Sequence, residues 1–265
     1  MRTMSIASGS SGNSIYMGTD NTHLLVDTGV SKKKIEEGLK KLDLSGNDIN
    51  GILITHEHSD HIGGLGVFLR KYPIPVYATK GTIEATLNYC RLGQVDESLF
   101  RPIEYDNHFM IGDIDICPIK ICHDAAEPSA FRFESGGKKS AVMTDLGCYN
   151  DYIVDAVSGL DTLYIEANHD IRMLELGPYS YELKRRILSN YGHLSNEMSG
   201  KLLDKVIHDN IKHIVLSHLS KENNMPEIAY ETVRLEVNMS ESCYCADDFH
   251  MLVASRDIPS DVLEF

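Results

Sequence analysis

The residues best suited to chemistry lie together in one short segment, 55–61, with the sequence Thr-His-Glu-His-Ser-Asp-His. It directly follows the apolar run Gly-Ile-Leu-Ile, which is typical of a buried strand. His56 and His58 are two residues apart, so on an extended backbone both side chains face one ion, whereas Asp60 and His61 turn towards a second ion. A polar surface loop with clustered histidines is the alternative, but this spacing at the end of a strand favours a site for two divalent metal ions.

Such a site needs more ligands than one loop holds, and three further candidates also follow predicted strands. Asp145 follows the strand 140–143, His218 follows the strand 213–216, and His123 ends a segment of alternating apolar and polar residues. The rigid backbone at the end of a strand fixes the geometry of a side chain closely, as metal ligation requires. Taken alone, His123 is typical of a structural histidine and Asp145 of a turn, so their interpretation as ligands depends on the metal-binding loop.

Two parts of the chain repeat one order of elements, and this repeat predicts how the ligands are positioned. A strand followed by Asp-Thr-Gly, at 24–29, matches a strand followed by Asp-Leu-Gly, at 141–147. The strand before Thr55 likewise matches the strand 162–165 before Glu166. Two halves of matching order predict two packed sheets with helices outside them, related by a pseudo-two-fold axis, with the metal ions where the halves meet.

The remaining elements follow from apolar periodicity, caps and turn residues. The predicted helices are 32–42 with Ser31 as its N-cap, 63–72, 82–91, 181–188, 196–209 and 226–237. Further predicted strands are 3–8, 15–18, 23–26, 74–78, 130–133 and 249–254. No Pro-rich or Ser-rich linker interrupts these elements, so we expect one domain over residues 1–265.

The composition limits the classes of protein and of partner. Of the 265 residues, 42% are hydrophobic and 24% are charged, which is typical of a globular protein with a full core. The N-terminus lacks the apolar stretch of a signal peptide, and the six cysteines show no disulfide spacing, so we expect a cytoplasmic protein with reduced thiols. The net charge of -14 disfavours a broad basic surface for nucleic acid, but two bound cations would still make an active site locally positive.

The His-x-His-x-Asp-His pattern of the loop is the signature of the metallo-β-lactamase superfamily, which the chain resembles. The resemblance implies an α/β fold, the αββα four-layer sandwich, with a dinuclear metal site at the edge of the two sheets. It assigns to the first ion His56, His58 and His123, to the second ion Asp60, His61 and His218, and as the bridging carboxylate Asp145. Zinc or manganese are the expected ions, and iron also suits these donors. Such ions activate water for the hydrolysis of phosphodiesters, thioesters or β-lactams, with Asp60 orienting the nucleophile.

Two motifs in the second half are similar to those of RNase Z, the branch that processes the 3′ ends of transfer RNA. They are Glu-Ala-Asn-His at 166–169 and Gly-His-Leu-Ser at 192–195. They imply that Glu166 and His193 form a proton relay for the leaving oxygen. The alternative is that His193 lies against the following helix and Glu166 is a structural carboxylate. Asp27, which has no place in the ligand pattern, is interpreted as a group that orients the histidines or as a turn residue.

Across residues 4–224 the resemblance extends to the bacterial YycJ (WalJ) family. The similar runs are Ser-Gly-Ser-Ser-Gly-Asn-Ser at 8–14, His-Asp-Ala at 123–125, Glu-Ala-Asn-His-Asp at 166–170, Gly-Pro-Tyr at 177–179, Leu-Lys-Arg-Arg-Ile at 183–187, Gly-His-Leu-Ser-Asn at 192–196 and His-Leu-Ser-Lys-Glu-Asn-Asn at 218–224. This family implies a cytoplasmic, dinuclear metal-dependent 5′-to-3′ DNA exonuclease with a part in mismatch repair. Asp145 and His218 are 73 residues apart (218 minus 145), which leaves no space for the β-CASP insertion of other nucleases in the superfamily.

The expected partner is therefore nucleic acid, DNA with a free 5′ end. The residues expected to contact it are Ser10, Asn168, His169, Tyr181, Lys184 and Arg185. The serine lies in a Gly/Ser-rich loop that either cradles phosphate or simply connects two strands, and the tyrosine and basic residues offer stacking and phosphate contacts or form a solvated helix face. A small-molecule or cyclic phosphodiesterase, a thioester hydrolase of the glyoxalase II type and a non-enzymatic scaffold remain as alternatives.

Overall fold

The structure, a computed structural model, describes residues 1–240 and 243–265 and divides them into two compact units. The first unit contains Met1–Lys120, Ala125–Gly137 and Ser255–Glu264, and the second contains Ile121–Asp124, Lys138–Ala254 and Phe265. The expectation of a single domain without a β-CASP insertion stays a prediction. Among the described residues, no helix has the length and apolar character needed to cross a membrane.

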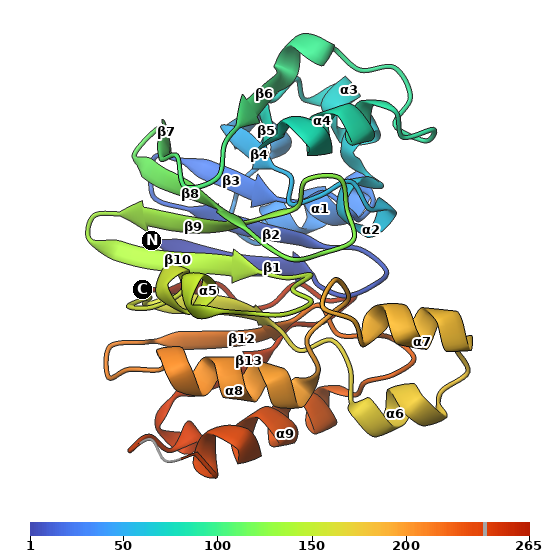
Figure 1. The fold of residues 1–265 in the computed structure, drawn as a ribbon. Helices are drawn as coiled ribbons and strands as arrows, with labels where there is room; N and C mark the ends of the chain where they lie inside the picture. The colour runs from blue at the N-terminus through green and yellow to red at the C-terminus, as the bar shows by residue number, and fades with distance from the viewer. Residues whose placement is uncertain (241–242) are drawn as a thin grey trace. The chain divides into compact units, whose positions relative to one another are not determined.

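The first unit is built around a mixed seven-stranded sheet (Figure 1). Its strands, in spatial order, are β14 (Leu263–Glu264), β1 (Arg2–Ala7), β2 (Ser14–Gly18), β3 (His23–Val26), β4 (Gly51–Leu53), β5 (Val76–Thr79) and β6 (Phe100–Ile103). Strands β1 to β3 are antiparallel, whereas β3 to β6 are parallel. An additional antiparallel ribbon in this unit consists of β7 (Phe109–Ile111), β8 (Ile114–Lys120) and β9 (Ser129–Ser135). Because β3 and β4 are parallel neighbours, Asp27 and the predicted metal-binding loop, residues 55–61, leave the sheet at the same edge.

The helices of the first unit are α1 (Lys32–Lys40), α2 (Ser59–Ile62), α3 (Leu65–Lys71) and α4 (Lys80–Leu87), with 3-10 turns at Gly46–Asp48 and Glu97–Leu99. Helix α1 begins after the predicted N-cap Ser31, and its residues Ile35 and Leu39 are fully buried in the core. The predicted helix 63–72 was wrong in its bounds, because α2 and α3 are separated by a pair of glycines. A Cβ on Gly64 would lie 2.0 Å from the carbonyl oxygen of Val30, so the chain passes too close here for a side chain.

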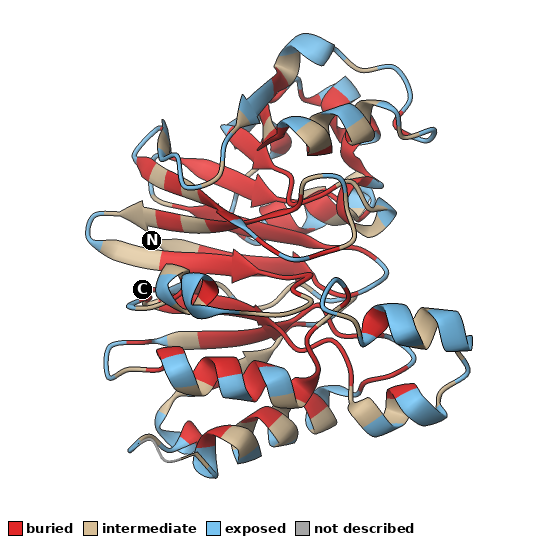
Figure 2. Ribbon diagram, viewed as in Figure 1, coloured by how far each residue is buried: buried red, intermediate tan, exposed pale blue. Residues whose placement is uncertain are grey.

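In the second unit, four strands are parallel in the order β10 (Lys138–Met143), β11 (Thr162–Glu166), β12 (His213–Ser217) and β13 (His250–Val253). Its helices are α5 (Asp151–Ala156), α6 (Ile171–Leu176), α7 (Tyr181–Ile187), α8 (Asn196–Val206) and α9 (Pro226–Asn238), with a 3-10 turn at Ala246–Asp248. Helices α8 and α9 lie side by side, and α8 turns one buried face inward (Figures 1 and 2). Glycine at position 200 permits their close approach, since a Cβ there would lie only 2.5 Å from the Cβ of Glu236.

The repeat predicted from the sequence is present in the order of the strands. The parallel pair β3–β4 of the first unit corresponds to the parallel pair β10–β11 of the second. In β11 and β12 the register pairs Glu166 with Ser217, which puts Glu166 next to the strand end that leads into His218. Since ligands of parallel sheets bind at the carboxyl ends of the strands, these ends are the expected location of a functional site in each unit.

Candidate metal centre

Three of the candidate residues follow strands in a left-handed backbone conformation. Asp27 follows β3 with a φ of 60°, Asp145 follows β10 with a φ of 59°, and His218 follows β12 with a φ of 57°. Residues other than glycine seldom adopt this conformation, which costs about 1–3 kcal/mol where the surroundings enforce it. Because such strain concentrates at functional sites, it favours these strand ends as the location of a functional site in each unit.

In the first unit, three histidine rings of the predicted metal-binding loop pack against one another. The ring centroid of His56 lies 4.5 Å from that of His58 and 4.1 Å from that of His61. A carboxylate oxygen of Asp60 lies 3.5 Å from Nε2 of His61. The loop therefore gathers all four side chains that the sequence indicated as metal-binding.

The loop is held in place by the segment between β1 and β2 and by the turn that follows β3. The backbone N–H of Asn13 donates to the carbonyl of Asp60 over 2.8 Å, and the N–H of Gly29 donates to the carbonyl of Asn13 over 2.8 Å. A Cβ on Gly29 would lie only 1.6 Å from the carbonyl oxygen of Asp60. The backbone position of Asp60 therefore requires glycine at position 29.

Asp27 orients one histidine of this loop. Its Oδ2 lies 2.7 Å from Nδ1 of His61 and accepts the hydroxyl of Thr55 over 2.8 Å, while its Oδ1 accepts the N–H of Thr55 over 2.9 Å. Burial raises the pKa of Asp27, and the contacts with His61 and Thr55 lower it only in part, so the net shift is upward. With Nδ1 of His61 donating to Asp27, the neutral ring presents Nε2 as its unprotonated nitrogen.

In the second unit, Glu166 holds two histidines at once. Its Oε1 lies 2.9 Å from Nδ1 of His193 and 2.8 Å from Nδ1 of His218, and its Oε2 accepts the N–H groups of Leu146 and Leu194 over 2.8 and 3.1 Å. Burial by itself raises the pKa of Glu166, but His193 and His218 lower it more, so the pKa lies well below its usual range. Glu166 is therefore an ionised carboxylate whose oxygens are both occupied by donors.

The other two candidates of the second unit lie beside this group. His123 donates from Nδ1 to the carbonyl of Gly192 over 3.1 Å, and its Nε2 lies 3.7 Å from Oδ1 of Asp145. The same Asp145 oxygen lies 3.5 Å from Nδ1 of His218 and 3.7 Å from Nδ1 of His193. The structure thus brings together His123, Asp145 and His218 with the two predicted relay residues.

The donor set suits divalent cations in both charge and tautomer. Asp145 and Glu166 are almost completely buried, and two buried negative charges are costly unless positive charge balances them. Ligand atoms of Asp145, Glu166, His193 and His218 all lie within 4.8 Å of one another. Imidazoles whose Nδ1 is held by an oxygen present Nε2, which is the arrangement typical of metal-ligating histidines. Imidazole and carboxylate donors fit zinc, manganese and iron.

A buried polar network, which the sequence did not reveal, supports the ends of β11 and β12. Asn168 donates from Nδ2 to the carbonyl of His218 over 2.9 Å. Asn224 donates from Nδ2 to the carbonyls of Ala167 and Asn168 over 2.9 and 3.0 Å. Asn168 was expected to contact the substrate, but its buried side chain fixes the left-handed turn at His218, so its place favours a positioning role.

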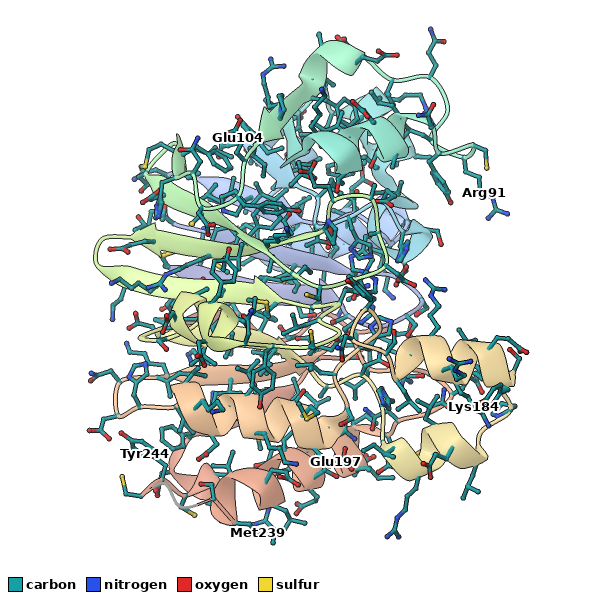
Figure 3. All side chains as sticks on the ribbon, viewed as in Figure 1. Arg91, Glu104, Lys184, Glu197, Met239 and Tyr244 are labelled. Carbon is teal, nitrogen blue, oxygen red and sulfur yellow. The ribbon has the colours of Figure 1, made fainter. Side chains whose placement is uncertain are left out.

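The remaining expected substrate contacts differ in their exposure. His169 is only 1% exposed, and burial lowers its pKa to about 4. Tyr181 is 70% exposed on α7, and the guanidinium of Arg185 lies 5.8 Å from its ring centre. Lys184 extends from the same helix and donates from Nζ to the carbonyl of Glu175 over 2.8 Å (Figure 3). In the first unit, Ser10 is exposed in the loop between β1 and β2.

Comparison with known proteins defines the class of fold. The model of the metallo-beta-lactamase superfamily matches residues 7–94. The crystal structure of the metallo-beta-lactamase fold protein YhfI from Bacillus subtilis superposes with a TM-score of 0.68 over 99% of both chains, at 16% identity. The fold is therefore that of the metallo-β-lactamase superfamily, the αββα sandwich expected from the sequence.

Two relatives of known name narrow the superfamily to one family. Exodeoxyribonuclease YycJ of Bacillus anthracis is 43% identical over 236 residues, which cover 86% of each chain. Exodeoxyribonuclease WalJ of Streptococcus pneumoniae is 44% identical over 228 residues, which cover 86% of this chain and 85% of the relative. The chain belongs to the YycJ/WalJ family of metallo-β-lactamase superfamily hydrolases.

Proposed function

We propose that this protein is a metal-dependent exodeoxyribonuclease that removes nucleotides from DNA in the 5′-to-3′ direction. The observation that carries the proposal is the identity of 43% and 44% to two exodeoxyribonucleases over 86% of the chain. The complete set of seven candidate ligands supports it, because every position of the superfamily's metal-binding pattern is occupied by a residue that can bind a divalent ion. A place in mismatch repair and in the cytoplasm is part of the same proposal.

Two divalent ions, zinc or manganese with iron as a further fit, are the proposed cofactors. The proposed ligands are His56, His58 and His123 for one ion, Asp60, His61 and His218 for the other, and Asp145 as the bridge. When bound, such ions supply Lewis acidity that activates water and neutralises charge on the phosphodiester. The side chains that hold Nδ1 of these histidines, Asp27 and Glu166, fix the ring orientations that ligation requires.

Within this proposal, Asp60, His193 and Glu166 carry out the proton chemistry. Asp60 accepts a hydrogen bond from the attacking water and thereby orients it. The side chain of His193 is 20% exposed, whereas that of His218 is 2% exposed, so His193 is the member of the pair that a substrate reaches. With Nδ1 donating to Glu166, a protonated His193 delivers the proton on Nε2 to the leaving oxygen.

The proposed substrate contacts lie on and around α7, with Ser10 as a phosphate contact in the first unit. Residues 171–191 contain four basic and two acidic residues, whereas the whole chain has a net charge of -14. Tyr181 supplies a face for an unpaired base, and Lys184 and Arg185 supply positive charge for phosphates. The local positive balance is what a nucleic-acid contact needs on an acidic protein.

The test incubates the purified protein with zinc, manganese or iron and with end-labelled single- and double-stranded DNA and RNA. Release of mononucleotides from the 5′ end of DNA is the expected result, and Asp60→Asn is the blank. Glu57→Gln is the matched control, since Glu57 lies in the same loop but accepts a hydrogen bond from the N–H of Ala126 and is outside the ligand set. Inertness on all polynucleotides combined with turnover of a thioester or of a cyclic phosphodiester would overturn the proposal.

A further inference from the structure

Two cysteine thiols of the second unit lie against each other beside two of the proposed metal ligands. Cys122 immediately precedes His123, and Cys148 follows Asp145 by three positions. The two thiols are hydrogen-bonded to each other. The backbone N–H of Gly147 also donates to the carbonyl of Cys122 over 2.8 Å. This backbone bond keeps the two segments side by side, so the contact of the thiols is built into the fold.

The two cysteines differ in a way that suits stepwise oxidation. Cys122 is exposed, whereas Cys148 is partly buried. An oxidant in solution therefore reaches Cys122 first, and Cys148 is held in place to react with the product.

We propose that Cys122 and Cys148 form a redox modification site, at which a peroxide converts the pair of thiols to a disulfide. Sulfur of Cys122 attacks hydrogen peroxide, the O–O bond breaks, and a sulfenic acid and one water are formed. Sulfur of Cys148 then attacks the sulfenic sulfur, the S–O bond breaks, and a second water leaves. The two thiols lose two electrons and two protons in total, and the peroxide takes up both.

The disulfide acts on the metal centre through the chain segments that it joins. A disulfide needs its sulfurs about 2.05 Å apart, which is much closer than two hydrogen-bonded thiols, so its formation draws the two segments together. Because metal ligands must be held within about 0.5 Å of their working positions, the shift at His123 and Asp145 weakens metal binding. This consequence rests on the proposed function, whereas the formation of the disulfide does not.

The experiment starts from the reduced protein, loaded with manganese or zinc and freed of reductant. After treatment with hydrogen peroxide, the protein is denatured and its thiols are titrated, unreduced peptides are analysed by mass spectrometry, and bound metal is measured. We expect the loss of two of the six titratable thiols, a peptide that links Cys122 to Cys148, less bound metal, and recovery of the thiols with dithiothreitol. Retention of all six thiols, or a link between other cysteines such as Cys243 and Cys245, would overturn the proposal.

Two variants separate the pair from the other thiols. In Cys148→Ser, oxidation stops at the sulfenic acid of Cys122, which dimedone then labels, and the link is absent. In the control Cys117→Ser, another partly buried cysteine is removed and the link between Cys122 and Cys148 still forms. Cys122→Ser, at an exposed position, is the substitute if Cys148→Ser does not fold. These thiol measurements stand whether or not the protein degrades DNA, so failure of the nuclease assay leaves them interpretable.

Discussion

Asp27 of the first unit and Glu166 of the second unit are both buried carboxylates that hold Nδ1 of a histidine, yet they carry different numbers of donors. Asp27 accepts hydrogen bonds from His61 and from two groups of Thr55. Glu166 accepts from two histidines and from two backbone N–H groups.

This difference appears in their pKa values. Burial raises the pKa of both groups, but the upward shift persists for Asp27, whereas the two histidines reverse it for Glu166. Burial alone therefore does not decide whether a carboxylate stays ionised at these strand ends. The donors decide it, because each one that points at the ionised form stabilises it.

The largest expected effect concerns His193, one of the two histidines that Glu166 contacts. If His193 protonates the leaving oxygen, His193→Ala lowers kcat on DNA by about 10²–10⁴-fold while both metal ions remain bound. His218→Ala, which removes the other histidine of the pair, lowers the content of bound metal as well. Metal analysis of the two variants beside the nuclease assay makes this distinction, and loss of metal from His193→Ala would show that the two histidines share one role.

The next effect tests the shared acceptor itself. Glu166→Gln places an NH₂ group against either the histidine N–H groups or the backbone N–H groups, so at least one pair of donors loses its acceptor. We expect the activity on DNA to fall by about 100-fold, since two ring orientations are lost together. Glu227→Gln, the same substitution at an exposed position of α9, is the control and leaves the activity unchanged.

A smaller effect is expected at the corresponding carboxylate of the first unit. Asp27→Asn disturbs one histidine, His61, rather than two, so we expect a decrease in activity of about tenfold. Asparagine tolerates the left-handed backbone at this position. The control is Asp43→Asn, because Asp43 also has a positive φ, of 57°, but is exposed. A decrease as large as that of Glu166→Gln would contradict the idea that the number of histidines sets the effect.

The smallest effect concerns the hydroxyl of Thr55, which donates a hydrogen bond to Asp27. Thr55→Val keeps the shape of the side chain but removes the donor to Asp27, and we expect the free energy of unfolding to fall by about 1–2 kcal/mol. Chemical denaturation of the protein measures this change. Thr86→Val is the control, because the buried hydroxyl of Thr86 has no hydrogen-bond partner within the described ranges 1–240 and 243–265, and its removal costs little.

Much of the fold was predictable because its signals are local. The strand 23–26, the N-cap Ser31 and the strand order of the repeat are specified by neighbouring residues, and the structure confirms them. Helices α5 and α6, with six residues each, are too short to show helical periodicity in the sequence. The predicted helix 63–72 began two residues too early, because α3 starts after Gly64. The close approach of Gly64 to Val30 is a tertiary contact that the sequence does not indicate.

For the candidate site, the sequence indicated which residues belong together but not how each one is held. Strand ends and the spacing of the histidines located the candidate ligands. Asp27 was interpreted either as a group that orients the histidines or as a turn residue, and in the structure it both contacts His61 and has a left-handed backbone. The contact of Glu166 with His193 was expected from two motifs. Its second contact, with His218, and the contact of Asn168 with the carbonyl of His218 were not expected, and they join residues that are far apart in the chain. Such contacts depend on tertiary structure, so no local pattern in the sequence indicates them.

The tight packing of Gly29 against the carbonyl of Asp60 has a consequence for experiments that randomise every position. In a saturation library selected for activity, substitutions at position 29 will be depleted as strongly as those at Asp60. The cause at Asp60 is chemical, whereas the cause at Gly29 is purely steric. Ranking positions by depletion alone would therefore count a residue without a side chain among the reactive groups.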